Sequence, residues 1–450
     1  MEWKWVVPVT MIAGGCLTCA RYQGSDLAPD WMINRAIYEV NIRQYSPGGT
    51  FREFETHLPR LQEMGVGIIW LMPIHPIGEQ NRKGTLGSYY AVKDYRAVNP
   101  EFGTMEDFRC LVRHIHELGM IVILDWVANH TAWDNPLAHD HPEWFMRDSL
   151  GRFVPPVADW HDVIDLDYSQ PGLRRYMTDA LKFWITETGV DGFRCDVAEM
   201  VPMDFWQSAI TELRQLKPIF MLAEGDAPQL YAAGFDMTYD WKLYYSMNEI
   251  AAGLKTPAVI DTHLRRVSSM YTSNALRMLF TTNHDENSWN GTARQRLGDA
   301  LTTFTVLTLT LDGMPLIYSG QEAGLDKSLR FFDKDTIEWR ADPLEHIFNT
   351  LLNFRRTHPV LWPGEKGGQM RKLNSHRLPV YAFTRSAGLE KVLVILNLSA
   401  GNVTYRPDDP ELTGSYVDLF NPSESTINPA WTIDLEPWAY RVFYSSKPKR

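Results

Sequence analysis

The sequence predicts an α/β fold, a (β/α)8 TIM barrel with a short inserted domain after the third strand and a C-terminal antiparallel β-sandwich. Three observations lead to this prediction. Eight short apolar runs alternate with amphipathic helical patterns, one long polar stretch interrupts the alternation, and β-type patterns follow near the end. Strands that alternate with helices favour a parallel sheet, and eight of them favour a closed barrel.

Each of the eight runs is brief and continuously apolar, as strands buried on both faces should be. A doubly wound open sheet is the alternative, but no G-x-G-x-x-G turn follows the first run. The expected strands are Ala36–Val40, Val66–Met72, Met120–Asp125, Gly192–Asp196, Ile219–Glu224, Phe235–Tyr239, Met278–Thr281 and Met314–Tyr318.

Helices are expected between these strands. Apolar residues recur at helical spacing from Phe51 to Met64 and from Met105 to Leu118. Gly65 and Gly119 follow the two patterns at the positions where C-terminal caps belong.

Two regions depart from the alternation. Residues 131–170 are rich in His, Asp, Trp and Pro, and a loop that long inside a compact domain usually serves function. After about residue 376, short β-type runs are separated by Gly, Pro and Asn turns. The expected division is a barrel at 26–130 and 171–375, an inserted domain at 131–170, and a sandwich at 376–450 whose strands include Val380–Thr384, Val392–Leu398, Tyr416–Leu419 and Tyr440–Tyr444.

The first 25 residues have the pattern of a leader. Lys4 precedes the apolar stretch Val6–Ile12, which is too short for a transmembrane helix but suits a signal-peptide core. The small residues before Cys16 resemble a bacterial lipoprotein cleavage site. We expect export with a lipid anchor at Cys16, in the periplasm or at the cell surface, and the alternative is a cytoplasmic protein. No later segment is apolar enough to be transmembrane.

Composition excludes one class of partner and favours another. The net charge of -11 argues against nucleic acid, because phosphates require a basic face. The 16 Trp and 19 Tyr residues fit a carbohydrate site, since sugar C–H groups pack on aromatic faces, although most such rings belong to a core.

Acidic residues follow four of the expected strands. Catalytic groups of a parallel barrel collect at the carboxyl ends of its strands, so these segments are candidates for the active site. They are Asp125-Trp126-Val127-Ala128-Asn129-His130, Gly192-Phe193-Arg194-Cys195-Asp196, Leu222-Ala223-Glu224 and Thr282-Asn283-His284-Asp285-Glu286.

In order and position, these segments resemble the four signature regions of the α-amylase family of glycoside hydrolases. The resemblance runs from about residue 30 over nearly the whole chain, with further matches at Gly65–Pro73, Ser88–Thr104, Asp165–Asp167 and Gly313–Glu322. It implies retaining hydrolysis of α-1,4-glucosidic bonds in starch-like glucans or malto-oligosaccharides, through a covalent glycosyl-enzyme intermediate. The alternatives are an α-glucosidase, a cyclodextrin-degrading enzyme or a glucosyl-transferring enzyme of the same family. More distant alternatives are a non-catalytic glucan-binding barrel and an unrelated barrel enzyme.

The resemblance also implies roles for the catalytic residues. Asp196 is expected to be the nucleophile, Glu224 the general acid/base and Asp285 the stabiliser of the transition state. Arg194 is expected to lower the pKa of Asp196, because a nucleophile must be ionised. Glu224 needs a raised pKa to protonate the leaving oxygen, and Asp125 is expected to orient other groups.

Further residues are expected to bind the substrate or a metal. Tyr90 matches an aromatic that stacks on the sugar, and His130 and His284 match donors to sugar hydroxyls. Asn129 and Asp165 match positions that hold calcium in relatives, although two oxygen ligands are few for an ion that takes 6–8. No organic cofactor is expected.

One position departs from the family pattern. Endo-amylases commonly carry Lys-His three and four residues after the nucleophile, where this chain has Glu199 and Met200. We expect Glu199 to point away from Asp196, toward the acceptor-side sugar or a basic neighbour.

Overall fold

The structure is a computed structural model, and it describes residues 32–445. The expected leader, residues 1–25 with Cys16, lies outside this range. Between residues 32 and 445, no helix is both long and apolar enough to cross a membrane.

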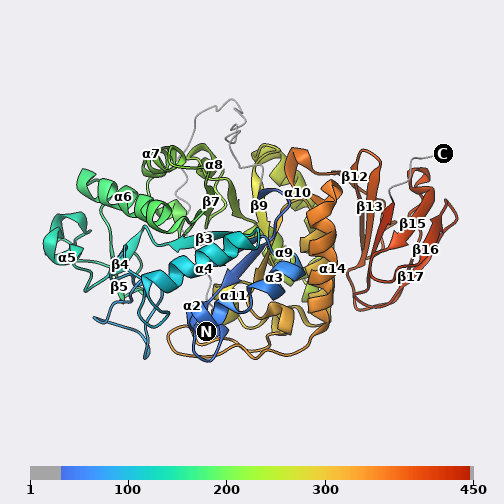
Figure 1. Cartoon of the computed structure of the whole chain (residues 1–450). Coiled ribbons are helices and arrows are strands. Elements are labelled where there is room, and N and C mark those ends of the chain that lie inside the picture. The colour runs from blue at the N-terminus through green and yellow to red at the C-terminus, as the bar shows by residue number, and fades with distance from the viewer. Residues whose placement is uncertain (1–31, 446–450) are drawn as a thin grey trace, which may run out of the picture.

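A closed barrel of eight parallel strands forms the centre of the molecule (Figure 1). Around the barrel the strands follow the order β1-β10-β9-β8-β7-β6-β3-β2. The predicted fold class is therefore confirmed. The strands are β1 Ile37–Val40, β2 Ile68–Leu71, β3 Ile121–Trp126, β6 Gly192–Cys195, β7 Phe220–Ala223, β8 Met237–Tyr239, β9 Leu276–Leu279 and β10 Met314–Tyr318.

The seventh barrel strand is displaced from its expected position. It spans Leu276–Leu279, whereas the sequence pattern placed it at Met278–Thr281. The polar residue Arg277 concealed its start: the side chain is buried, and Nη1 donates to Thr238 Oγ1 at 2.8 Å. Partners for this guanidinium come from β8 and from Asp240 just beyond it, which the sequence alone does not place beside β9.

Helices surround the barrel, and their ends follow local sequence signals. Thr104 and Asp107 form a reciprocal capping box at the start of α4, and Gly65 ends α3 in the left-handed conformation at φ 100°. The helices are α1 Ile42–Tyr45, α2 Phe51–Glu55, α3 Leu58–Met64, α4 Met105–Glu117, α5 Leu137–Asp140, α6 Pro171–Thr188, α7 Met203–Arg214, α8 Gln229–Ala232, α9 Trp241–Ala251, α10 Ala258–Met270, α11 His284–Trp289, α12 Ala293–Leu297, α13 Leu301–Thr310 and α14 Pro343–Thr357.

Residues alternate between the barrel interior and the helix layer along each strand. Ile37 of β1 belongs to the interior cluster, whereas Tyr38 and Val40 pack with the surrounding helices. Glu39 shares the parity of Ile37 and therefore faces inward. The interior cluster fills the barrel with side chains, so polar groups gather at the carboxyl ends of the strands.

The inserted segment forms a small antiparallel ribbon between β3 and α6. Strand β4, His130–Ala132, pairs with β5, Val163–Asp165, and α5 lies between them in sequence. Lys83, which follows β2, binds this segment through the Asp162 carboxylate and the Asp159 carbonyl, each at 2.8 Å. Figure 1 shows the segment at the end of the molecule opposite the C-terminal strands.

The C-terminal region is an antiparallel sheet with the strand order β11-β12-β13-β18-β15-β16, accompanied by the ribbon β14-β17. One face packs with α13 and α14 in the main core, and the other forms a separate apolar cluster with the ribbon. The sheet begins at Gln369, ahead of the expected boundary at residue 376. The strands are β11 Gln369–Lys372, β12 Val380–Ala387, β13 Glu390–Asn397, β14 Val403–Tyr405, β15 Gly414–Asp418, β16 Glu424–Ile427, β17 Ile433–Leu435 and β18 Tyr440–Ser445.

Candidate active site

Strands β6 and β7 place two carboxylates side by side at the carboxyl end of the barrel. Asp196 and Glu224 each follow the last residue of their strand. The Asp196 N–H donates to the Trp126 carbonyl at 3.0 Å, and the Glu224 N–H donates to the Cys195 carbonyl at 3.0 Å. The barrel ladder thus continues one residue further and fixes both backbones.

Asp285 comes from a different element, the first turn of α11. This helix begins where the chain leaves β9, and Asn283 caps it by accepting the Glu286 N–H at 2.8 Å. The Asp285 side chain is 37% exposed, more than those of Asp196 (10%) and Glu224 (15%). Asp285 is therefore the most open of the three carboxylates.

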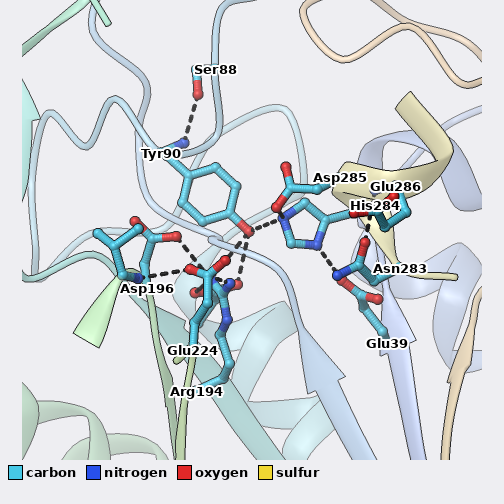
Figure 2. A network of polar contacts seen from close by, with 12 residues as sticks. Glu39, Ser88, Tyr90, Arg194, Asp196, Glu224, Asn283, His284, Asp285 and Glu286 are labelled. Atoms are coloured by element: carbon cyan, nitrogen blue, oxygen red, sulfur yellow. Dashed lines mark hydrogen bonds and ion pairs between the residues drawn. The ribbon is translucent and has the colours of Figure 1, made fainter. Parts of the chain in front are cut away.

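The buried guanidinium of Arg194 contacts three carboxylates, and Figure 2 shows it beside Asp196 and Glu224. Arg194 Nη1 lies 2.8 Å from Asp125 Oδ1 and 3.0 Å from Asp196 Oδ1. Arg194 Nη2 lies 2.8 Å from Glu224 Oε2, which is an ion pair without good hydrogen-bond alignment. The full burial of Arg194 makes each of these contacts strong, because water does not screen them.

Asp125 orients its neighbours, as expected. Its Oδ2 accepts hydrogen bonds from Trp70 Nε1 at 3.2 Å and from the Tyr90 hydroxyl at 3.0 Å, while Oδ1 faces Arg194. Burial raises the pKa of Asp125 to about 6, although Arg194 opposes this shift. With both oxygens occupied, Asp125 holds Arg194 and Tyr90 in place.

His284 lies between two carboxylates. Its Nδ1 is 2.5 Å from Glu39 Oε1, and its Nε2 is 2.8 Å from the Tyr90 hydroxyl and 3.3 Å from Asp285 Oδ2. Burial lowers the pKa of His284, but the charges of Asp285 and Glu39 outweigh it and raise the pKa to about 9. His284 is therefore an imidazolium at neutral pH, with both ring nitrogens able to donate.

Arg194 acts to lower the pKa of Asp196, as expected, but the net pKa shifts of the paired carboxyls run opposite to those expected from the sequence. Burial and the charge of Glu224 raise the pKa of Asp196 well above its ordinary value, despite Arg194. Burial also acts to raise the pKa of Glu224, but Arg194 and the Val197 N–H together lower it. The expectation overlooked that Arg194 reaches both carboxyls, and that Glu224 Oε2 also accepts the Val197 N–H at 2.7 Å.

The remaining predicted sugar-binding residues surround the same point. Tyr90 stacks on the His284 ring, with centroids 5.5 Å apart and an interplanar angle of 18°. His130 Nε2 lies 4.0 Å from Asp196 Oδ2. Burial lowers the pKa of His130 to about 4, so this imidazole is neutral and can both donate and accept.

Sequence reasoning missed two residues of this network. Glu39 is a fully buried acid inside the apolar strand β1, and Tyr239, at the end of β8, accepts a hydrogen bond from Arg194 Nε at 3.1 Å. An acid inside an otherwise apolar strand is itself a signal, because an unpartnered buried carboxylate is costly. Tyr239 carries no such signal.

Glu199 does not bind the basic neighbour that the sequence suggested. Its Oε1 accepts the backbone N–H groups of Asp226 and Ala227, at 2.7 and 2.8 Å. These partners belong to the loop after β7, so Glu199 binds backbone amides and not a basic side chain. The expected basic neighbour was wrong because backbone amides of a distant loop cannot be seen as partners in the sequence.

The expected calcium position has a small donor set. The β4–β5 pairing brings Asn129 and Asp165 together, and the Leu166 N–H donates to the Asn129 carbonyl at 3.2 Å and to Asp165 Oδ1 at 3.1 Å. Asp162, the neighbouring carboxylate, is neutralised by Lys83. Within residues 32–445 no group of three or more His, Cys, Asp or Glu side chains could hold a metal. Two side-chain oxygens do not fit an ion that takes 6–8, so calcium at this position remains a prediction from the resemblance alone.

Aromatic rings continue outward from Tyr90. Phe331 stacks on Tyr90 at 6.1 Å with an interplanar angle of 16°, and Trp289 lies 5.3 Å from Phe331. Phe332 is 5.7 Å from Trp289, whose side chain is 55% exposed. We call Trp289, Phe331 and Phe332 the aromatic wall. It connects the buried Tyr90–His284 pair with the surface.

Comparison with known proteins agrees with this arrangement. The family described as "Alpha amylase, catalytic domain" matches residues 21–147 and 143–368, more than half of the chain. An α-amylase of Haloarcula japonica is 27% identical over 401 residues, which are 84% of this chain and 57% of that protein. The chain thus spans little more than half the length of that relative. A cyclomaltodextrinase of a Bacillus species is 27% identical over 80% of this chain and 67% of that protein.

Solved structures extend the match to the C-terminal sheet. A maltogenic α-amylase from Thermotoga neapolitana has a TM-score of 0.82 and 32% identity, and the match covers 93% of this chain and 98% of that chain. An α-amylase from Lactobacillus plantarum also has a TM-score of 0.82 and 32% identity, with coverage of 92% and 99%. With the family match spanning the barrel and the carboxylates gathered at its carboxyl end, the chain belongs to the α-amylase family of glycoside hydrolases.

Proposed function

We propose that the protein is a retaining glycoside hydrolase that cleaves α-1,4-glucosidic bonds in starch-like glucans or malto-oligosaccharides. One observation carries most of the argument: the buried Arg194 guanidinium lies within 3.0 Å of both Asp196 and Glu224. Two carboxyls held so close together suit the retaining geometry, in which they stand about 5–5.5 Å apart. Names of relatives, among them an α-amylase and a cyclomaltodextrinase, support the substrate class.

In the first step, an Asp196 carboxylate oxygen attacks the anomeric carbon while Glu224 protonates the glycosidic oxygen. The carbon–oxygen bond to the leaving chain breaks, and a glycosyl ester forms on Asp196. Asp285 stabilises the positive charge that develops on the sugar ring; burial raises the pKa of this carboxyl, and its contact with the His284 imidazolium opposes that shift and favours the ionised form. His284 and His130 donate hydrogen bonds to hydroxyls of the same sugar.

In the second step, Glu224 removes a proton from water, which attacks the anomeric carbon and breaks the ester. Asp196 leaves as a carboxylate, and the product keeps its α configuration. If a sugar takes the place of water, the same step transfers the glycosyl group. The glucosyl-transferring alternative therefore needs no additional catalytic group.

Glu224 must carry a proton when the leaving oxygen departs, and Asp196 must be ionised when it attacks. Without a sugar, burial and the charge of Glu224 raise the pKa of Asp196, whereas Arg194 and the Val197 N–H lower that of Glu224. An incoming sugar displaces water from Glu224 and thereby raises the pKa of this carboxyl. We propose that a bound sugar reverses the order of the two pKa values, so that Glu224 becomes the acid and Asp196 the attacking carboxylate.

Product analysis tests the substrate class directly. The wild type and Asp196→Asn would be incubated with maltoheptaose, soluble starch and a cyclodextrin, and the products separated by chromatography. We expect the wild type to release shorter malto-oligosaccharides, and Asp196→Asn to lose nearly all turnover while it remains folded. Action on the cyclodextrin alone would favour the cyclodextrin-degrading alternative, and products longer than the substrate would favour transfer. Unchanged glucans in all three incubations would contradict the proposal.

We also propose export with a lipid anchor at Cys16, which rests on the pattern of the first 25 residues. Metabolic labelling with an alkyne-tagged fatty acid in a bacterial host should mark the wild type and leave Cys16→Ser unmarked. Recovery of the full-length, unmodified wild type from the cytosol would refute the proposal.

A further inference from the structure

The acid/base residue is held by the turn that follows the nucleophile. Val197 donates its N–H to Glu224 Oε2 at 2.7 Å, and Ala198 donates its N–H to the Glu224 carbonyl at 3.1 Å. Val197 adopts the left-handed conformation, with φ 38° and ψ 47°, which is rare for a β-branched residue. This strained turn persists only where surrounding contacts hold it.

A second pair of hydrogen bonds runs in the opposite direction. Glu199 leaves the same turn and accepts the N–H groups of Asp226 and Ala227 on a single oxygen, at 2.7 and 2.8 Å. We call this connection between residues 197–199 and 224–227 the Glu199 clamp. Each half of the clamp thus contains at least one short N–H bond to a carboxyl oxygen.

Gly225, which directly follows Glu224, is adapted to this contact. Its φ of 150° is disfavoured for other residues, and a Cβ on it would lie 2.5 Å from Glu199 Oε1. Only glycine lets the carboxylate approach the loop closely enough to bind both amides. The absence of a side chain at 225 and the two hydrogen bonds are independent observations that point to the same fixed loop.

We propose that Glu199 is a positioning residue for general acid catalysis: it fixes the loop after Glu224 and thereby the direction in which Glu224 presents its proton. The inference rests on the proposed function of Glu224. Glu199 touches no group that reacts, because its bonded partners are the amides two and three residues beyond Glu224. Without the Glu199 carboxylate, residues 226 and 227 lose their tie to the nucleophile turn, and the Glu224 carboxyl, still held by Val197 and Arg194, is oriented less firmly toward the leaving oxygen.

Two substrates separate this role from a purely structural one. A sugar leaving group must be protonated as the bond breaks, so cleavage of maltotetraose depends on Glu224. Fluoride leaves readily without a proton, so α-maltosyl fluoride depends on Asp196 but hardly on Glu224. The values of kcat/KM compare the two substrates, because kcat/KM reports the steps up to the first irreversible one.

The test compares Glu199→Ala and Glu199→Gln with the wild type. We expect Glu199→Ala to lower kcat/KM for maltotetraose by roughly 10- to 100-fold, a large part of what a general acid contributes, and to change it little for α-maltosyl fluoride. Glu199→Gln should restore most of the activity on maltotetraose, because the amide oxygen can still accept both N–H groups. Glu117→Ala, which removes an exposed carboxylate from α4, is the matched control and should leave both substrates unaffected.

Three outcomes overturn the proposal. Equal losses on both substrates mean that Glu199 only supports the fold, no loss on either means that the clamp is dispensable, and a Glu199→Gln variant as slow as Glu199→Ala means that charge and not acceptance matters. If Glu199→Ala does not fold, Glu199→Asp replaces it, since the shorter side chain cannot reach both amides.

Glu224→Gln keeps this test separate from that of the proposed function. It should lose activity on maltotetraose and keep its kcat/KM for α-maltosyl fluoride. If it does so while Glu199→Ala leaves both substrates unaffected or slows them equally, only the inference about Glu199 falls. If Glu224→Gln loses both substrates alike, Glu224 is not the acid and the proposed function itself fails.

Discussion

Glu39 stabilises the positive charge of the His284 imidazolium, which lies beside the reacting carboxylates. Together with Asp285 it raises the pKa of His284 to about 9, so the imidazolium is the main form at neutral pH. The contact of His284 with Asp285 favours the ionised form of that carboxyl, and the proton on His284 Nε2 is available to the Tyr90 oxygen. We therefore expect activity to fall as the pH rises through 9 and His284 loses its charge.

Glu39→Gln tests this role. Removing the carboxylate should move the pKa of His284 toward its ordinary value, so the alkaline limb of the kcat/KM profile should shift to lower pH. The raised pKa stabilises the folded state fully below pH 6.5 and loses this effect as the pH rises through 9. Glu39→Gln should accordingly lower the free energy of unfolding by about 1.5–3 kcal/mol at pH 6 and by less at pH 9.5. An unchanged alkaline limb would show that Glu39 does not control the charge of His284.

The site could be predicted from the sequence only in part, and the reason lies in which partners are local. Asp196 and Glu224 follow apolar strands, so their place at the end of a barrel could be predicted from position alone. The shared use of Arg194 and the amides that bind Glu199 depend on how neighbouring strands and loops face one another. For this reason the net pKa shifts of the two carboxyls and the partners of Glu199 differ from those expected.

At the scale of elements, the inserted ribbon is tied to the barrel by a buried ion pair. Asp162 is 6% exposed and Lys83 is 22% exposed in their side chains, so this pair is better shielded from water than most surface pairs. An ammonium group thus neutralises the acidic side chain next to the position where the resemblance suggested calcium.

Lys83→Ala tests how much this ion pair stabilises the fold. We expect it to lower the free energy of unfolding by about 3–5 kcal/mol at most, because a shielded carboxylate is left without its partner. Lys182→Ala, which breaks the more exposed pair with Glu212, is the matched control and should cost about 0–1 kcal/mol. EDTA should leave the melting temperature of the wild type unchanged, and a large calcium-dependent rise would contradict this account of the ribbon.

The aromatic wall belongs to two further elements, α11 and the chain after β10. Trp289 is 55% exposed while Phe331 stacks on Tyr90, so the wall offers open ring surface that continues from the reacting sugar. Trp289→Ala should raise KM for maltoheptaose by roughly 2- to 13-fold, the effect of losing about 0.5–1.5 kcal/mol of ring packing, and leave kcat nearly unchanged. Equal KM values for maltoheptaose in wild type and variant would remove Trp289 from the binding surface.

For whole elements the sequence was a good guide, and its errors have a physical cause. Apolar runs marked all eight barrel strands, because a strand covered on both faces must be apolar along its length. The pattern misplaced the bounds of β9, because Arg277 near its start finds its partners on β8 and just beyond that strand. A buried charge interrupts such a pattern whenever tertiary contacts satisfy it.

At the scale of the whole molecule, the C-terminal sheet and the barrel share one core. Helix α13, Leu301–Thr310, is buried on nearly every side, and its Phe304 belongs to the same apolar cluster as Tyr381 and Val392 of the sheet. A helix that is buried all round requires covering elements on all its faces. The sheet therefore completes the fold of the catalytic region.

A chain ending at residue 368 tests this interdependence. Removal of the strands from β11 onward would expose the apolar surface of α13 and α14, so we expect the shortened chain to aggregate or remain unfolded. Expression followed by size-exclusion chromatography and circular dichroism would measure this. A soluble, cooperatively folding product of that length would show that the barrel is stable without the sheet.

The proposed mechanism requires a covalent bond to Asp196, and trapping that intermediate tests it most directly. A 5-fluoro-α-maltosyl fluoride reacts slowly in both steps, because the second fluorine destabilises the positive charge of each transition state. We expect it to leave a maltosyl adduct that peptide mass spectrometry assigns to Asp196, absent from Asp196→Asn, while turnover of maltoheptaose releases product of α configuration by NMR. An adduct on another residue, or a product of β configuration, would contradict the account.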